Sequence, residues 1–137
     1  MSGYLLDTNI ASHVIRGDRP QITRRLAVLP MADIAISVVT EGELLYGLAK
    51  RNHPPVLAER VRQFLLRVDI LDWSREAARA YADLRAACER QGIGLAALDL
   101  MIAAHAVAED AVLVTRDKAF SKVSALRTDD WAAREPL

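Results

Sequence analysis

Short apolar runs alternate with longer stretches of helical pattern along this chain of 137 residues. Four of the runs are short and apolar, which is typical of buried strands: 4–6, 34–36, 70–71 and 112–114. Helical patterns fill the intervals: 9–16, 21–29, 38–51, 56–68, 75–91 and 98–109. Strands separated by helices need right-handed crossovers. The chain therefore predicts an α/β fold of three layers, α/β/α, around a central and mostly parallel sheet.

Proline, glycine and serine mark the ends of several expected helices. Pro20 and Pro30 delimit one of them, and Gly17 and Gly92 stand where two others should end. Ser74 fits the N-cap position before the helix expected from residue 75. The sequence has no internal repeat, low-complexity tract or linker. We therefore expect residues 1–137 to form a single domain.

The composition is that of an ordinary globular protein, with 52% hydrophobic residues and 18 basic residues balancing 18 acidic ones. A net charge of zero counts mildly against a non-specific nucleic-acid binder and favours association. No apolar stretch approaches the ~20 residues of a membrane span, and no signal peptide is evident. The single cysteine, Cys88, fits a buried thiol in a reducing compartment. A cytoplasmic location is expected.

Four acidic residues stand beside apolar segments: Asp7, Glu43, Asp99 and Asp117. Asp7 follows the first expected strand and Asp117 comes shortly after the strand at 112–114. A parallel sheet places such residues at the carboxyl ends of neighbouring strands, where ligands bind. Carboxylates held close together repel one another unless a hard cation neutralises them, and Mg²⁺ or Mn²⁺ prefers oxygen ligands. The pattern predicts a metal site and phosphate chemistry.

Each of these acids also fits a purely structural role. Asp7 is a suitable N-cap for the helix that starts near residue 9, and Thr40-x-x-Glu43 fits a capping box. Asp99 falls in the first turn of a helix, where the dipole favours a negative charge. Asp117 fits an ordinary turn. Both interpretations stay open on spacing alone, because first-turn acids can also point into the crevice of a parallel sheet.

Four acidic motifs and a closing segment occur in a fixed order over nearly the whole chain. They are Tyr4-Leu5-Leu6-Asp7-Thr8-Asn9, Ser37-x-x-Thr40-x-x-Glu43-Leu44-x-x-Gly47, Gly92-x-x-x-x-x-x-Asp99-x-x-Ile102-Ala103-Ala104-x-Ala106, Leu113-Val114-Thr115-x-Asp117-x-x-Phe120 and Leu126-Arg127-Thr128-Asp129-Asp130-Trp131. With these motifs the chain resembles PIN-domain proteins, and in particular the VapC toxins of bacterial toxin–antitoxin pairs.

The resemblance implies a metal-binding and catalytic role for all four acids. It also implies that Thr115 is a supporting hydroxyl and that Asn9 holds the loop of Asp7. Two departures concern the rim of the site. VapC toxins often have a Gly-Pro-aromatic approach where this chain has Ala96-Ala97-Leu98, and the position of Asp117 is Asp or Asn among relatives.

The implied activity is hydrolysis of RNA phosphodiester bonds by an endoribonuclease that uses one or two Mg²⁺ or Mn²⁺ ions. Substrate phosphates need basic neighbours, for which the best candidates are Arg116, Lys118, Lys50 and Arg51. The three histidines, His13, His53 and His105, lie outside the motifs and are expected at surface or half-buried helical positions. Trp73 and Trp131 flank expected strands and fit packing roles.

The resemblance also implies partners. A small VapB-like antitoxin would mask the site, and DNA would be reached only through that antitoxin. A homodimer is expected, through the helical surfaces of residues 38–51 and 56–68. RNA is the expected substrate, and no membrane is involved.

Other classes of protein fit the sequence less well. A haloacid-dehalogenase-like phosphatase needs a second Asp two positions after the first, where this chain has Asn9, and it needs a later Lys motif that is absent. A receiver domain needs a clustered acidic pair near the first strand, and the fit is poor. A catalytically silent PIN-like interaction module is the remaining alternative. The four acids argue against it.

Overall fold

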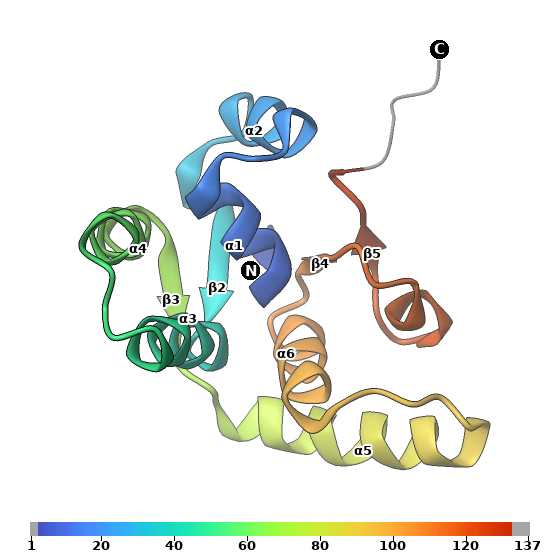
Figure 1. Cartoon of the computed structure of the whole chain (residues 1–137). Helices are drawn as coiled ribbons and strands as arrows, with labels where there is room; N and C mark the ends of the chain where they lie inside the picture. Colours follow the sequence, from blue (N-terminus) through green and yellow to red (C-terminus); the bar gives the residue numbers. More distant parts are fainter. Residues whose placement is uncertain (1–2, 133–137) are drawn as a thin grey trace.

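A five-stranded parallel sheet forms the centre of the computed structural model, which describes residues 3–132 (Figure 1). Its strands are β1 (Tyr4–Leu6), β2 (Ile34–Ser37), β3 (Asp69–Leu71), β4 (Val112–Val114) and β5 (Thr128–Asp129). The strand order is β3-β2-β1-β4-β5, and every pairing is parallel. The order reverses between β1 and its two neighbours, β2 and β4, which creates the switch point where ligands bind in such sheets. The predicted parallel sheet is confirmed.

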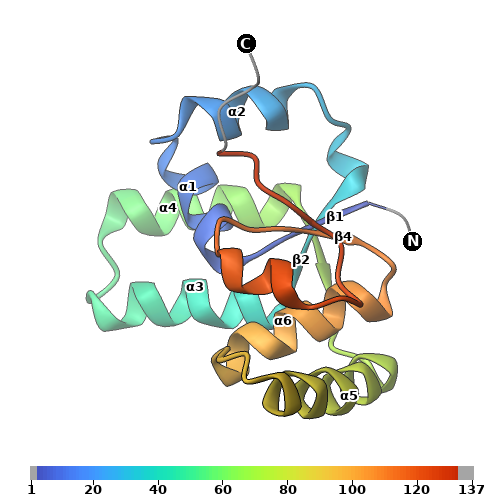
Figure 2. The ribbon, with the colours of Figure 1, turned by 90° about the vertical axis from the view of Figure 1, so that its right-hand side faces the viewer.

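Within the described residues, six α-helices connect the strands, and two short 3₁₀ helices accompany them. The α-helices are α1 (Thr8–Arg16), α2 (Pro20–Ala27), α3 (Val38–Lys50), α4 (Pro55–Arg67), α5 (Arg75–Gln91) and α6 (Ala97–Ala108). The 3₁₀ helices are η1 (Met31–Asp33) and η2 (Lys118–Lys122). Figure 2 shows α3 and α4 side by side as one pair and α5 beneath α6 as another. Every expected α-helix forms, with bounds within two residues of those expected from the pattern, whereas the 3₁₀ helices were not expected.

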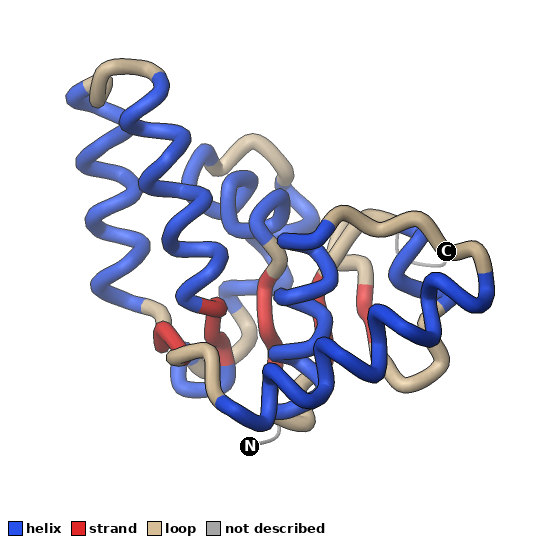
Figure 3. The backbone as a smooth tube through the Cα atoms, turned by 90° about the horizontal axis from the view of Figure 1, so that it is seen from below, coloured by secondary structure: helices blue, strands red, loops and turns tan. Residues whose placement is uncertain are grey.

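The sheet has a separate apolar core on each face, because successive side chains of a strand point to opposite sides. On β1, Leu5 packs into the core beneath α5 and α6, and Leu6 packs into the core beneath α1, α2 and α4. On β4, Leu113 and Val114 divide in the same way. The tube in Figure 3 shows these short strands enclosed by helices. The three predicted layers are therefore present.

Side chains at the helix ends confirm some local predictions and correct one. Gly17 and Gly92 end α1 and α5 with φ of 63° and 68°, a left-handed conformation that glycine adopts without strain. Ser74 caps α5 by accepting a hydrogen bond from Ala77 N at 3.1 Å. The expected capping box of Thr40 and Glu43 is wrong. Ser37 caps α3 instead, because its hydroxyl accepts from Val39 N at 3.1 Å, and Thr40 is fully buried within the helix.

The tryptophans and the cysteine pack as expected. Trp131 is 3% exposed, and its ring meets the edge of Tyr4 with centroids 5.3 Å apart. Trp73 packs against Tyr81, and its indole N–H donates to the backbone carbonyl of Met101 at 3.1 Å. Cys88 is buried and carries a free thiol. Within residues 3–132, no helix has the length and apolar character needed to span a membrane.

Candidate active site

Asp7 lies at the carboxyl end of β1, beside the end of β4. Its backbone N–H donates to the carbonyl of Val114 at 3.0 Å, which continues the β1–β4 ladder by one residue. Its carboxylate oxygen Oδ1 accepts from Ile10 N at 2.8 Å and caps α1. The side chain is only 6% exposed. The strand end and the helix cap together fix the direction of this carboxylate.

Asp117 reaches the same edge of the sheet from the segment after β4. Its Oδ1 accepts from Ala119 N at 2.9 Å and caps η2, and the side chain is exposed. Its backbone N–H donates to the hydroxyl of Thr115 at 3.1 Å. The buried Thr115 hydroxyl also hydrogen-bonds to the carboxylate of Asp7. Thr115 thus links the two acids, and its role as a supporting hydroxyl stays a prediction.

Glu43 comes to the site from the middle of α3, and Thr8 holds it there. The Thr8 hydroxyl donates to Oε1 of Glu43 at 2.7 Å. The same Thr8 oxygen lies 3.3 Å from the hydroxyl of Thr40, which is fully buried. The sequence analysis assigned no role to Thr8. The available signal was its place between Asp7 and Asn9 in the first motif.

Asp99 stands in the first turn of α6 and is half-buried. The residue at the N-cap of this helix is Ala96, which has no side-chain acceptor for the first N–H groups. The positive end of the helix dipole therefore faces the Asp99 carboxylate without a competing cap. The position of Asp99 in the first turn of a helix is the one expected from the sequence, and its role as a metal ligand stays a prediction.

The four carboxylates affect one another electrostatically. Burial is the main cause that raises the pKa of Asp7. The charges of Asp117 and Glu43 raise it further, against the opposing hydrogen bonds from Thr115 and Ile10. Burial is also the main cause that raises the pKa of Asp99, and the charges of Glu43, Asp7 and Asp117 add to it. Because the charges of Glu43 and Asp117 act on both Asp7 and Asp99, we group the four acids as the acidic cluster.

The chemistry of this cluster suits a hard divalent cation. All four donors are carboxylates, the ligands that Mg²⁺ and Mn²⁺ prefer. A bound cation would offset the burial, and the smaller effect of the neighbouring charges, that raise the pKa of Asp7 and of Asp99. No group of three or more His, Cys, Asp or Glu side chains in residues 3–132 is arranged closely enough to hold an ion. The donor set fits a metal in chemistry, and a bound ion would require the side chains to converge.

Comparison with known proteins places the chain in a family. The family model for the PIN domain matches residues 4–126. The chain belongs to the PIN-domain family. It is 35% identical over 133 residues to the tRNA(fMet)-specific endonuclease VapC of Shigella flexneri, covering 96% of this chain and 100% of that protein. It is also 35% identical to ribonuclease VapC2 of Rickettsia felis, with 93% and 97% covered.

Solved structures agree with this PIN assignment. VapBC2 from Rickettsia felis, bound to a DNA fragment from its promoter, has a chain that superposes with a TM-score of 0.87 at 33% identity. DNA-bound VapBC from Salmonella typhimurium gives a TM-score of 0.88 at 31% identity. Each match covers 96% of this chain and 99% of the other. The similarity therefore extends over the whole PIN fold.

The basic residues expected to bind RNA lie in different surroundings in this PIN domain. Arg51 lines a groove of about 140 Å³ that also contains Thr8, Glu43 and Gly47. Lys50 lies over the ring of Tyr46 instead, 5.8 Å from its centroid. Arg116 and Lys118 are exposed on either side of Asp117. Their roles stay predictions, as does that of Asn9, whose side chain is exposed.

The histidines of the PIN domain differ from one another, and one departs from expectation. His13 pairs with Asp18 at 2.8 Å, and His53 is exposed. His105 is 0% exposed, so the expectation of a surface or half-buried position is wrong for it. It faces the sheet from α6, where the hydroxyl of Ser37 gives the ring a polar partner 2.8 Å from Nδ1.

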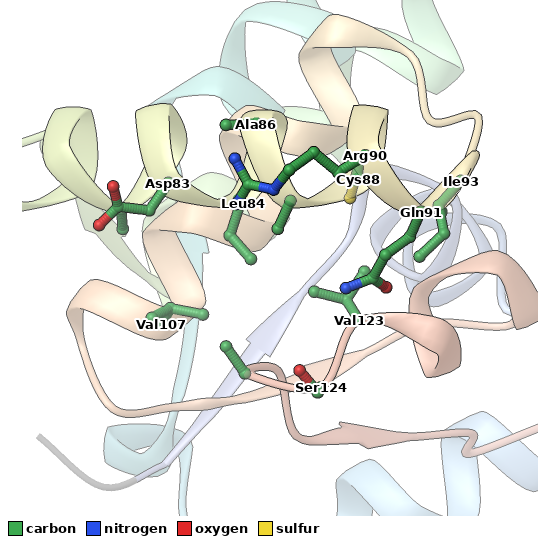
Figure 4. Close-up of a pocket in the computed structure, with 13 residues that line it drawn as sticks. Asp83, Leu84, Ala86, Cys88, Arg90, Gln91, Ile93, Val107, Val123 and Ser124 are labelled. Carbon is green, nitrogen blue, oxygen red and sulfur yellow. The ribbon is translucent and has the colours of Figure 1, made fainter.

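A larger cavity of about 560 Å³ opens elsewhere, between the C-terminal half of α5, the end of α6 and the segment around Ser124 (Figure 4). Leu84, Cys88, Val107 and Val123 contribute to its mostly apolar lining. None of the four carboxylates of the acidic cluster lines it. The candidate active site is therefore the acidic edge of the sheet and not this cavity.

Proposed function

We propose that this PIN-domain protein is a metal-dependent endoribonuclease and the toxin of a type II toxin–antitoxin pair. The observation that carries the proposal is the acidic cluster at the switch point of the sheet, where Asp7 caps α1 at the end of β1 and Thr8 holds Glu43 by a hydrogen bond of 2.7 Å. Burial raises the pKa of Asp99, and the charges of Glu43, Asp7 and Asp117 raise it further. The VapC ribonucleases that the chain matches over nearly its full length support it. The reaction is hydrolysis of an RNA phosphodiester bond.

Asp7, Glu43, Asp99 and Asp117 would hold one or two Mg²⁺ or Mn²⁺ ions. When bound, such an ion supplies an activated water and stabilises the charge that develops on the leaving 3′ oxygen. The chain itself keeps the carboxylates in place. Thr8 orients Glu43 through the hydrogen bond of 2.7 Å, and Thr115 is bonded to both Asp7 and the backbone of Asp117.

Substrate binding would rely on the basic residues around the acids. Arg51 shares a groove with Glu43, so a phosphate bound there would lie beside the cluster. Arg116 and Lys118 flank Asp117 and are free to reach the adjoining phosphates. These contacts are independent of base sequence, because they are made with the RNA backbone.

We infer a VapB-like antitoxin as the protein partner, since the two solved structures described above are VapBC complexes bound to DNA. DNA would be bound only through that antitoxin. A homodimer would use the paired helices α3 and α4, which expose apolar side chains: Leu45 46%, Tyr46 64%, Val56 71% and Leu66 69%. An apolar surface of this kind is typical of a contact between proteins.

RNA cleavage by matched variants tests the proposal. The purified protein is incubated with total cellular RNA in Mg²⁺, in Mn²⁺ and in excess chelator. Glu43→Gln removes a carboxylate of the cluster, and Glu41→Gln removes one from the same helix as its control. We expect cleavage only with a divalent cation, retained by Glu41→Gln and lost by Glu43→Gln and Asp99→Asn.

Two results would count against the proposal in different ways. Cleavage at full rate in excess chelator would exclude the metal mechanism. A wild-type protein that binds antitoxin but cleaves no RNA with either ion would favour the catalytically silent PIN module.

A further inference from the structure

A buried hydrogen bond joins the two helices that carry Asp99 and Glu43. His105 of α6 and Ser37, at the end of β2, are both 0% exposed, and Nδ1 of the ring lies 2.8 Å from the Ser37 hydroxyl oxygen. The same oxygen accepts from Val39 N and caps α3. The ring of His105 therefore contacts the residue that starts the helix of Glu43.

The surroundings of the ring determine which nitrogen carries the proton. The groups that face the ring besides Ser37 are the Glu109 carboxylate, 4.0 Å from Nε2, and the backbone carbonyl of Asp72. Because the Ser37 oxygen already accepts from Val39 N, its own O–H can donate to Nδ1, and we infer that the ring proton is on Nε2. The lone pair of Nδ1 then accepts from the Ser37 O–H, while that oxygen accepts from Val39 N. The result is a series of two hydrogen bonds that runs from Val39 N at the start of α3, through the Ser37 hydroxyl, to Nδ1 of His105 on α6.

This arrangement is costly as mere packing. Within residues 3–132, Nε2 of His105 is buried and makes no hydrogen bond, and a buried polar atom without a partner destabilises the fold. The neighbouring core positions of α6 are filled by Ile102, Ala103 and Ala104. An apolar side chain of similar size would avoid the penalty at position 105. What it would lose is the directed hydrogen bond to Ser37.

The position of the bond explains what it holds. Ser37 precedes Glu43 by six residues, and Asp99 precedes His105 by the same number, a rise of about 9 Å along a helix in each case. The bond therefore ties α3 to α6 at similar distances from the two acids. Further along α3, Thr40 and Glu43 contact Thr8 at the start of α1. The helix is thus fixed to α6 at one point and to α1 at another.

We propose that His105 is a positioning residue, which acts through Ser37 to hold α3 against α6 so that Glu43 and Asp99 face one site. The inference rests on the proposed function for its effect on catalysis, whereas the hydrogen bond and its effect on metal binding do not require RNA cleavage. His105 touches none of the four acids in this role. Its contribution comes from the Nδ1 lone pair and not from a charge on the ring.

Two conservative substitutions separate the nitrogens of the ring. His105→Asn places an amide near the position of Nδ1, and His105→Gln places one near Nε2. We expect His105→Asn to retain activity, and His105→Gln and His105→Leu to lose roughly 10- to 100-fold in kcat and in Mn²⁺ affinity, with the KM for RNA little changed. Glu109→Gln is the control on the Nε2 side and should behave as the wild type.

Ser37→Ala tests whether His105 acts through the cap. Because both residues belong to one chain of hydrogen bonds, the loss in the double variant with His105→Gln should be no larger than the loss in either single variant. Losses that multiply would overturn the proposal. Thermal unfolding of each variant reports on the fold, and if His105→Leu does not fold, the Asn and Gln pair decides.

Two measurements do not depend on RNA cleavage. Nitrogen NMR of the His105 ring should show a protonated Nε2 and an unprotonated Nδ1, and calorimetry with Mn²⁺ alone should show weaker binding by His105→Gln than by His105→Asn. A protonated Nδ1, or equal Mn²⁺ affinity in the two variants, would refute the positioning role. A wild type that cleaves no RNA would refute the proposed function and leave these two measurements decisive for His105.

Discussion

Asp7 makes two opposing contributions to stability, and two substitutions separate them. Its Oδ1 caps α1 by accepting from Ile10 N at 2.8 Å, which stabilises the fold. Its charge is desolvated and faces Glu43 and Asp117, and this destabilises the fold when no cation is bound. Asp7→Asn keeps an acceptor for the cap and removes the charge. Asp7→Ala removes both.

The size of the difference follows from the cap. Asn and Asp are equally good N-caps, and replacement by Ala costs about 1 kcal/mol. Asp7→Ala should therefore unfold at a temperature roughly 4 °C below that of Asp7→Asn. In chelator, Asp7→Asn should be more stable than the wild type, because the amide relieves both the desolvation and the repulsion. Neither variant should cleave RNA.

The dependence on pH has a definite sign. The pKa of Asp7 is raised in the fold above its ordinary value of 3.8, mainly by burial. The folded state therefore binds the proton more tightly than the unfolded state. The metal-free wild type should lose stability as the pH rises from about 4 through the folded pKa, and Asp7→Asn should lack this component of the loss.

The melting temperatures of the wild type, Asp7→Asn and Asp7→Ala are measured by circular dichroism in excess chelator. The measurement is repeated from pH 4 to pH 8. An Asp7→Asn variant that melts below the wild type at pH 8 would refute the argument from repulsion. Equal melting temperatures for Asp7→Asn and Asp7→Ala would show that the hydrogen bond to Ile10 contributes nothing to stability.

Three further predictions concern the site and its partners. Thr8→Val keeps the shape of the side chain but removes the donor to Glu43, and we expect it to lose at least 10-fold in kcat. Thr23→Val is the surface control. An unchanged rate for Thr8→Val would show that Thr8 has no role in the site. Light scattering at tens of micromolar protein should give the mass of a dimer for the wild type and of a monomer for Tyr46→Glu. A monomeric wild type would overturn the proposed homodimer through α3 and α4. The antitoxin should insert an arginine among Asp7, Glu43 and Asp99, because a guanidinium suits an acidic pocket. Replacing that arginine should weaken inhibition of RNA cleavage more than it weakens binding of the antitoxin. Inhibition that survives replacement of every arginine in the inhibitory segment would exclude inhibition by an inserted arginine.

Local signals in the sequence were enough for strands β1 to β4 and for the α-helices of the described residues, but not for β5 or the two 3₁₀ helices. The apolar pattern of residues 4–6 and 112–114 matches β1 and β4 at both ends, and Gly17 and Gly92 end their helices as expected. The mistakes came where local signals compete. Thr40 fits an N-cap pattern, but the strand before it ends at Ser37, so the helix begins three residues earlier and Thr40 is buried inside it.

The sequence by itself determined the parallel three-layer fold, and through the order of its motifs it predicted the four acids as the site. Only the tertiary structure decided what holds those acids in place. Thr8 and Glu43 are 35 residues apart and His105 and Ser37 are 68 apart, yet each pair forms a hydrogen bond. Such contacts depend on how helices pack across the sheet, which no short-range pattern specifies. The periodicity of α6 indicates an apolar helix, but it does not show that His105 of this helix contacts Ser37 of β2.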